Sequence, residues 1–148
     1  LKQMEAEYFM ISPELDQFNH REFFDHLSEF MKREDFNSYT TWDSVGVMID
    51  PQRLAKKEYL DYTHFYSRIE DVTQAQTVFL KPKGLYLIAY HRGSYDTTYQ
   101  TYDRMIEFAK QNNLEFSGYS YEEFILDEIS VIGYDNYLTQ IQIQVQLK

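Results

Sequence analysis

The sequence predicts an α+β fold in which helices cover one side of an antiparallel sheet. Two patterns in its 148 residues lead to this prediction. The order strand, helix, strand, strand occurs twice, over residues 5–70 and 76–148, with a seam between 70 and 76. The final strand also alternates between apolar residues and glutamines, which is typical of an antiparallel strand with one face on the core. We therefore expect a single domain of two fused modules related by a pseudo-twofold repeat.

The first module begins with a strand candidate at residues 7–12, which is rich in aromatic and aliphatic side chains. A helix is expected next, because Asn19 and Glu22 form a capping-box pattern and apolar residues then recur at helical spacing. Two further strand candidates occupy residues 44–49 and 62–69. The apolar positions of the helix are Phe23, Leu27, Phe30 and Met31.

The second module repeats this order. A strand candidate at residues 84–91 leads to a helix after residues 93–96. This helix should end at Asn112-Asn113, because asparagine tolerates the left-handed conformation of a helix terminus. Strand candidates at residues 115–126 and 137–147 complete the module. The apolar stripe of the helix consists of Tyr99, Tyr102, Ile106 and Ala109.

Two short segments lie outside this repeat. A strand candidate at residues 77–80 opens the second module, and we expect it to pair with residues 84–91 through a turn at 81–84. Residues 1–5 are interpreted as the last turn of a helix that arrives from a preceding region. Because the chain starts with Leu1 rather than Met, we expect it to be part of a longer protein.

One strand carries acidic residues in an apolar setting, in the run Gly118-Tyr-Ser-Tyr-Glu-Glu-Phe-Ile-Leu-Asp127. Glu122 and Glu123 are adjacent, so on a strand their side chains point to opposite faces. We expect one of them to be solvated and the other to lie among aromatic side chains. A carboxylate in that position is costly unless it finds a partner. It is therefore either a ligand-binding group or a structural acid that pairs with Arg, Lys or Tyr hydroxyls.

The composition narrows the classes of partner. The formal net charge of −10 disfavours nucleic acid as a partner of these residues, since affinity for phosphate depends on Lys and Arg. There are no cysteines, and the four histidines are dispersed, so we expect no metal site and no cofactor. Apolar runs are too short for a membrane span, and a cytoplasmic protein without membrane contact is expected. The 14 tyrosines and 11 phenylalanines suit a core and a binding surface equally.

Several short motifs carry a family resemblance. In chain order they are His91-Arg-Gly-Ser-Tyr95, a Tyr-rich helix, Asn113-Leu114, Tyr121-Glu122-x-Phe124-x-x-Asp127 and Leu138-Thr-x-Ile-x-Ile-x-Val145. Together they resemble the effector-binding domain of multidrug-responsive MerR-type transcription regulators of bacteria, a domain also called GyrI-like. The resemblance covers residues 76–148 well, and it covers the first module mainly through the order of elements.

The resemblance implies a ligand cleft between the two modules, in which a buried glutamate ringed by aromatic side chains recognises lipophilic cations. The family pattern places this glutamate at Glu122 and leaves Glu123 to solvent. Cation–π contacts of about 0.5–2 kcal/mol each would support such recognition. The expected aromatic residues of the cleft are Tyr137, Tyr95 and Tyr99 from the second module and Tyr39, Trp42, Phe65 and Tyr66 from the first.

We therefore interpret the chain as a ligand-sensing domain, more a binding protein than an enzyme. Its expected ligands are hydrophobic or cationic small molecules. DNA would be contacted only through an N-terminal region absent from this chain, and the full-length protein would be a homodimer. The alternative is a stand-alone GyrI-like hydrolase in which Glu122 acts as general base, helped by a Tyr hydroxyl. A third possibility is a module that binds another protein through its acidic surface.

Overall fold

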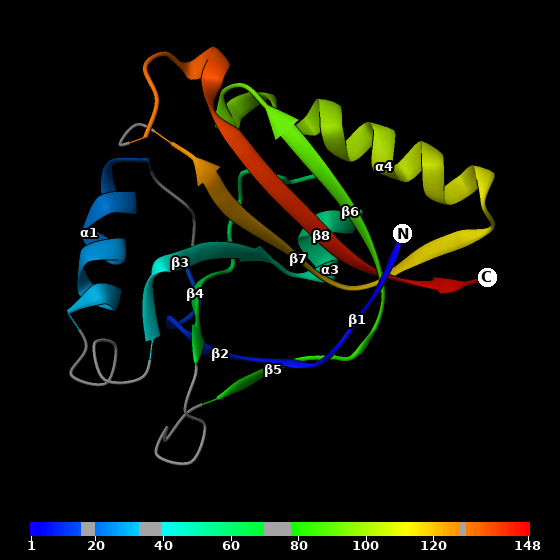
Figure 1. The fold of residues 1–148 in the computed structure, drawn as a ribbon, viewed down its shortest axis with the longest axis horizontal. Helices are drawn as coiled ribbons and strands as arrows, with labels where there is room; N and C mark the ends of the chain where they lie inside the picture. The colour runs from blue at the N-terminus through cyan, green and yellow to red at the C-terminus, as the bar shows by residue number, and fades with distance from the viewer. Residues whose placement is uncertain (16–19, 33–39, 70–77, 128–129) are drawn as a thin grey trace.

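The chain forms an eight-stranded antiparallel sheet with three helices, as seen in a computed structural model that describes residues 1–15, 20–32, 40–69, 78–127 and 130–148 (Figure 1). The predicted α+β class is confirmed. The strands are β1 (Lys2–Met4), β2 (Glu7–Ile11), β3 (Thr40–Ile49), β4 (His64–Ile69), β5 (Phe79–Lys81), β6 (Gly84–Arg92), β7 (Leu114–Leu126) and β8 (Leu138–Leu147). The helices are α1 (His20–Met31), α3 (Pro51–Ala55) and α4 (Tyr99–Gln111), with short 3₁₀ turns η1 (Tyr95–Thr97) and η2 (Tyr134–Asn136).

The strand order across the sheet is β1-β6-β8-β7-β3-β4-β2-β5. Each half of the chain contributes three strands in the same spatial order, β7-β8-β6 from one half and β3-β4-β2 from the other. The halves meet at the centre, where β3 and β7 run antiparallel. The sheet is strongly curled (Figure 1), and its two edge strands approach each other where Nζ of Lys81 in β5 lies 4.0 Å from Sδ of Met4 in β1.

The edge strands are exchanged between the halves, which corrects two sequence-based expectations. The strand predicted at residues 77–80 pairs not with β6 but with β2, opposite Glu7 and Phe9. A tight hairpin to β6 would need left-handed backbone in its turn, and Pro82 fixes φ at a negative value. Residues 1–5 do not end a helix, because residues 2–4 form β1 and pair with β6.

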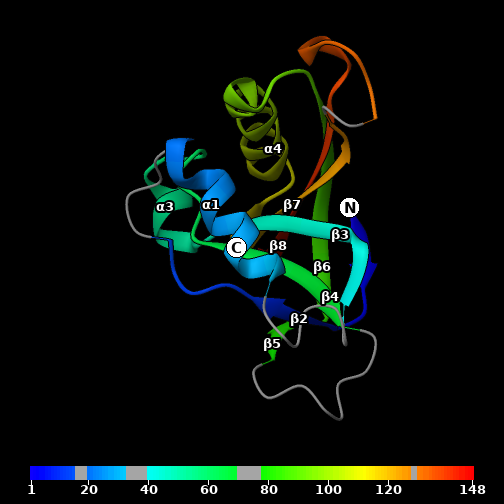
Figure 2. The same ribbon diagram turned by 90° about the vertical axis from the view of Figure 1, so that its left-hand side faces the viewer.

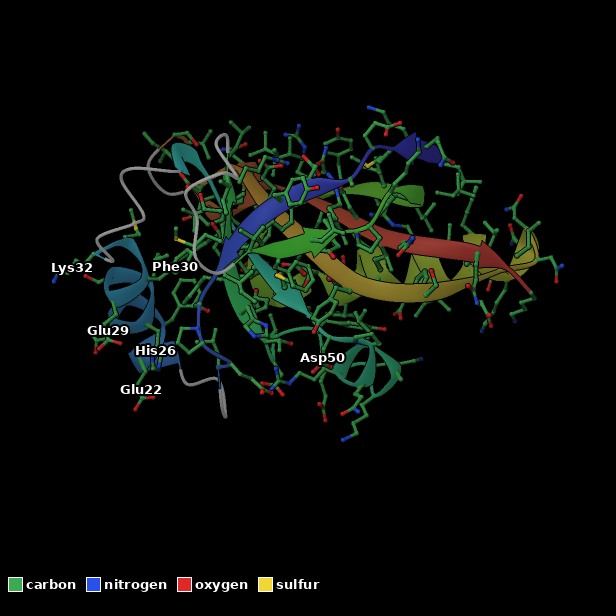
Figure 3. All side chains as sticks on the ribbon, turned by 90° about the horizontal axis from the view of Figure 1, so that it is seen from below. Glu22, His26, Glu29, Phe30, Lys32 and Asp50 are labelled. Atoms are coloured by element: carbon green, nitrogen blue, oxygen red, sulfur yellow. The ribbon has the colours of Figure 1, made fainter. Side chains whose placement is uncertain are left out.

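The helices α1 and α4 pack on one face of the sheet, and Figure 2 shows both on the same side together with α3. Phe30 of α1 points toward the sheet in Figure 3, whereas Glu22, His26 and Glu29 point away from it. The predicted helical spacing of α1 is therefore confirmed, while Asn19 lies outside the described residues. Asp50, also labelled in Figure 3, caps α3 by accepting a hydrogen bond from the Arg53 amide at 2.8 Å.

Helix α4 buries a slightly different stripe from the predicted one. Tyr102 and Ala109 are buried as expected, but Met105 also faces the core and Tyr99 is 49% exposed. The helix ends as predicted, because Asn113 adopts a left-handed conformation with φ of 55°.

The opposite face of the sheet is buried by its own curl. Five large side chains form a second cluster there, and no described helix covers them: Phe9, Met48, Tyr66, Tyr86 and Tyr121. Lys81, from the edge strand β5, is only 1% exposed and lies over the rings of Tyr86 and Tyr121 at 4.7 and 5.3 Å. The sheet therefore separates two buried environments, one beneath the helices and one inside the curl.

Candidate functional site

Glu122 lies at the centre of the sheet, on the face that the helices cover. Its register partners are Val47 of β3 and Ile141 of β8, both of which are buried and apolar. The side chain of Glu122 is 0% exposed. The strand-parity prediction that one of the two adjacent acids faces the core is thus confirmed, and that acid is Glu122.

Among the described residues, one side chain forms a hydrogen bond with the carboxylate of Glu122. The hydroxyl of Tyr102, from α4, donates to its Oε1 at 2.6 Å. The same hydroxyl lies 2.7 Å from Oγ of Ser120, which precedes Glu122 by two residues on the same strand face. The second carboxylate oxygen, Oε2, is buried and has no hydrogen-bond partner among the described residues. A buried oxygen of this kind is expensive to leave unpaired.

Burial controls the ionisation of this group. Desolvation raises the pKa of Glu122 to about 7, although the hydrogen bond from Tyr102 acts to lower it. Burial likewise raises the pKa of Tyr102 and that of Tyr62 well above the ordinary value, and the nearby charge of Glu122 adds to both shifts. Two phenols and one carboxyl therefore share a region of low polarity in which charge is disfavoured.

Aromatic rings flank the carboxylate from both halves of the chain. The ring of Tyr59 stacks flat on that of Tyr102, with centroids 4.2 Å apart and planes inclined by 1°. The hydroxyl of Tyr59 is buried and has no hydrogen-bond partner among the described residues. The phenol of Tyr62 is electrostatically coupled to both Glu122 and Tyr95. The ring of Tyr62 lies 6.4 Å from that of Phe23 in α1.

A second group of rings continues along the same strand face. Phe124 follows Glu122 by two residues, and the ring of Tyr95 lies 5.1 Å from it. Tyr137 lies 5.2 Å from Tyr95 and 5.3 Å from Tyr134. Tyr95 and Tyr137, both expected at the site, therefore lie on the face that carries Glu122.

The remaining predicted aromatic residues fall in different places. Phe65 lies on the face of Glu122, where its ring packs against Phe23 and Phe30 in the core. Tyr66 lies on the other face, inside the curl, because it pairs with Gly46 opposite Glu123. Tyr99 is at the surface, where its hydroxyl accepts a hydrogen bond from Gln100. Tyr39 and the side chain of Trp42 lie outside the described residues.

Glu123 does not face solvent as expected. Its side chain is 16% exposed and forms two hydrogen bonds with Arg68, at 2.6 and 3.1 Å. Arg68 also contacts Glu7 at 3.0 Å, and Glu7 contacts Lys81 at 2.8 Å. These charges meet on the face opposite Glu122, where Lys81 is buried while Arg68 and Glu7 stay partly exposed. Alternation along one strand cannot indicate partners from other strands.

Sequence reasoning missed three tyrosines of the site. Tyr102 was assigned only to the apolar stripe of α4, while Tyr59 and Tyr62 precede β4 and were not singled out. One signal was available for Tyr102: a tyrosine on a buried stripe brings a hydroxyl into the core, and that hydroxyl needs a partner. Glu122, the acid expected among apolar residues of a neighbouring strand, is a candidate for that partner.

Other chemistry finds little support in the described parts of the chain. No three His, Cys, Asp or Glu side chains gather there in a way that could hold a metal ion. His91 is buried, and its two ring nitrogens contact Thr101, Thr97 and the Ser94 carbonyl at 2.8–3.0 Å. The helices in these ranges are too short or too polar to span a membrane.

Comparison with known proteins places this site in a family. The GyrI-like small molecule binding domain matches residues 15–146. The chain belongs to this GyrI-like family. The predicted resemblance is thereby confirmed, and the buried Glu122 with its aromatic rings lies in a small-molecule binding domain.

Relatives of this GyrI-like domain include a bacterial regulator. The chain is 28% identical, over 143 residues, to the multidrug-efflux transporter 2 regulator of Bacillus subtilis (strain 168). The match covers 97% of the chain but only 52% of that regulator, so the chain spans about half of its length.

Solved structures show the same fold. The crystal structure of the EcmrR C-terminal domain superposes with a TM-score of 0.71 at 15% identity, covering 99% of this chain and 96% of that one. An uncharacterized conserved protein from Listeria innocua superposes with a TM-score of 0.62 at 10% identity, covering 98% and 90%. At identities this low, the likeness establishes the fold alone.

Proposed function

We propose that this GyrI-like domain senses ligands for a bacterial transcription regulator of the MerR type, by binding lipophilic and often cationic small molecules at Glu122. One observation carries the proposal. Glu122 is wholly buried among aromatic rings, and its Oε2 has no hydrogen-bond partner among the described residues. A buried carboxylate is costly unless it is paired. A ligand cation would provide the missing partner.

The proposed cleft lies between the two modules. Tyr59 and Tyr62 come from the first module, while Tyr102 and Glu122 come from the second. Flat aromatic faces attract a cation by about 0.5–2 kcal/mol each and recognise shape loosely, which suits a site for several compounds. Because Glu122 is fully buried, a ligand reaches it only when neighbouring rings move aside.

The regulatory part of the proposal is supported by the name of the Bacillus subtilis relative, of which this chain matches about half. In the full protein, a region outside this chain would contact DNA, and two copies would form a homodimer. Ligand binding would act by favouring one of two arrangements of that assembly, to the extent that the ligand binds one arrangement more tightly.

Hydrolysis of small molecules is the second candidate, and the ionisation of Glu122 favours it. A general base works best when its pKa lies near the operating pH, and the pKa of Glu122 is raised to about 7. The hydroxyl of Tyr102, at 2.6 Å, would serve as a hydrogen-bond donor beside it. In this case, Glu122 would activate a water molecule.

A thermal-shift assay with a matched pair of ligands tests the binding proposal. Tetraphenylphosphonium is a permanent lipophilic cation, and triphenylphosphine oxide is a smaller neutral compound that carries three of the same phenyl groups on phosphorus. A ligand at about a hundredfold its dissociation constant stabilises the folded state by roughly 2.7 kcal/mol.

We expect tetraphenylphosphonium to stabilise the protein and Glu122→Gln to remove most of that shift. Glu115→Gln, at an exposed position of the same strand, is the control for net charge. Equal shifts in all three proteins would refute recognition by Glu122.

The hydrolase candidate has its own readout. If the protein is a hydrolase, we expect it to hydrolyse a chromogenic ester, and we expect Glu122→Gln to abolish this hydrolysis. Tetraphenylphosphonium binding without any ester turnover would leave the sensing function and exclude the hydrolytic one for this substrate class.

A further inference from the structure

No cationic side chain opposes Glu122 from the described elements around it. The neighbouring strands present Val47 and Ile141, and β4 presents Phe65. The titratable groups near it are phenols, Tyr102 from α4 and Tyr62 ahead of β4. The ion pair of the adjacent Glu123 with Arg68 lies on the other face of the sheet.

The hydrogen bonds around Glu122 fit two protonation states. With a charged carboxylate, the Tyr102 hydroxyl donates to Oε1, and Ser120 donates to the Tyr102 oxygen. With a neutral carboxyl group, Oε1 carries the proton and donates to Tyr102, while Tyr102 donates to Ser120. Both contacts are short, at 2.6 and 2.7 Å, and either atom of the Tyr102–Ser120 pair can be the donor. Apart from the proton on Glu122, only hydroxyl rotations separate the two states.

The unpaired oxygen makes the neutral state the less costly one without a ligand. A charged carboxylate would leave Oε2 with negative charge and no donor in a fully buried position. A neutral carboxyl group would leave there only an uncharged carbonyl oxygen. Desolvation accordingly raises the pKa of Glu122 to about 7.

We propose that Glu122 carries a proton in the ligand-free protein and releases it to solvent when a lipophilic cation binds, so that the site takes up cations in exchange for protons. This inference rests on the proposed function. The O–H bond of the carboxyl group breaks, its proton passes to a buffer base, and the carboxylate that remains pairs with the cation. The charge of the site is zero before and after the exchange.

The exchange also separates two classes of ligand. A permanent cation binds with release of a proton, and its apparent affinity falls about tenfold for each pH unit below the pKa of Glu122. A neutral ligand makes no ion pair with the carboxylate and binds both protonation states of Glu122 alike, so no proton is exchanged and its affinity does not change with pH. The site would thus favour cations at alkaline pH and lose them first as the pH falls.

Isothermal titration of the protein with tetraphenylphosphonium tests this exchange, because this probe has no titratable group. Titrations in two buffers of different ionisation enthalpy give the number of protons released. We expect close to one proton per cation near pH 6 and almost none at about pH 8.5, with an affinity roughly tenfold or more lower at the acidic pH. Glu122→Gln should bind the cation more weakly and release no proton, whereas Glu115→Gln should match the unmodified protein.

Two outcomes would overturn the inference in different ways. Tetraphenylphosphonium binding that depends on Glu122 but releases no proton near pH 6 would refute the exchange and leave the proposed function intact. Binding that is equally tight in Glu122→Gln, or no binding at all, would refute the proposed function and the exchange with it.

Discussion

Glu122 and Glu123 are consecutive in β7, yet their carboxylates occupy opposite environments. Glu122 lies beneath the helices, where the described residues give it one hydrogen bond, from Tyr102, and leave its Oε2 unpaired. Glu123 lies inside the curl of the sheet and is held by two hydrogen bonds from Arg68. One strand therefore carries an acid paired with a guanidinium next to an acid that has no ionic partner in the described part of the chain.

Removing Glu122 should make the protein less sensitive to alkaline pH. The folded-state pKa of about 7 is above the unfolded value of 4.5, so the folded state binds the proton more tightly. The resulting stabilisation is complete below the unfolded pKa and is lost as the pH rises through the folded pKa. The difference between the folded and unfolded pKa values of Glu122 corresponds to about 3 kcal/mol of stabilisation. Urea unfolding measures the free energy of unfolding of both proteins near pH 5 and near pH 8. The stability of Glu122→Gln relative to the unmodified protein should be higher at pH 8 than at pH 5. A constant difference between the two proteins would contradict this prediction.

Replacing Tyr102 by Phe should raise the pKa of Glu122 further. The phenol donates the only side-chain hydrogen bond that favours the charged carboxylate among the described residues. The loss of a hydrogen bond to a charged group costs about 1.5–3 kcal/mol at a pH where Glu122 is ionised. Carboxyl carbon chemical shifts followed by NMR during a pH titration measure this pKa directly. An unchanged or lowered pKa would show that Tyr102 does not stabilise the charged form.

The buried lysine inside the curl should be far more important for stability than its neighbour at the surface. Lys81 donates to Glu7 at 2.8 Å and to Gln142 at 2.6 Å, and burial lowers its pKa in spite of Glu7. Glu7 keeps Arg68 as a partner when Lys81 is removed, so the expected cost is that of the lost charge-assisted hydrogen bonds, about 1.5–3 kcal/mol. Lys81→Met should therefore lower the free energy of unfolding by an amount in this range.

Lys83→Met is the matched control for that experiment. Lys83 pairs with Glu5 at 3.1 Å, but both side chains are largely exposed, and such pairs contribute at most about 1 kcal/mol. Chemical denaturation gives the free energy of unfolding of both variants. Similar losses for Lys81→Met and Lys83→Met would contradict the importance of the buried network.

A methyl group at Gly46 should disturb the central pairing of β3 with β7. A Cβ there would lie 2.3 Å from the Glu122 carbonyl oxygen and 2.5 Å from the Tyr66 ring, so the backbone must shift. Overpacking of this kind costs about 1–3 kcal/mol. Gly118→Ala is the control, because its Cβ would meet only the flexible Gln144 side chain at 3.3 Å. Thermal unfolding should separate the two variants, and equal melting temperatures would contradict the close approach at Gly46.

Local patterns predicted much of this fold and one part of the site. Helical spacing located α1 and α4, and strand parity assigned Glu122 and Glu123 to opposite faces. The partner of Glu123 was not predictable, because Arg68 is 55 residues away and meets it only through the sheet. The exchange of β1 and β5 between the halves is likewise a long-range pairing that no local pattern reveals.

The burial of an acid on this strand was predictable from sequence, whereas most of the rings near it were not. A carboxylate in an apolar strand is visible in sequence, whereas the rings around it depend on how helices and loops pack. Tyr66 and Phe65 are neighbours in β4, and the curl directs one inside and the other beneath the helices. Tyr102 reaches Glu122 because α4 crosses this part of the sheet, a geometry that helical spacing does not specify.

One comparison of affinities tests recognition by charge most directly. Tetraphenylphosphonium and triphenylphosphine oxide are each titrated into the unmodified protein and into Glu122→Gln at about pH 8.5. If Glu122 recognises the cation, Glu122→Gln should bind tetraphenylphosphonium roughly tenfold or more weakly than the unmodified protein does. Its affinity for triphenylphosphine oxide should be nearly unchanged. Equal losses for both compounds, or no loss for either, would contradict the role assigned to Glu122.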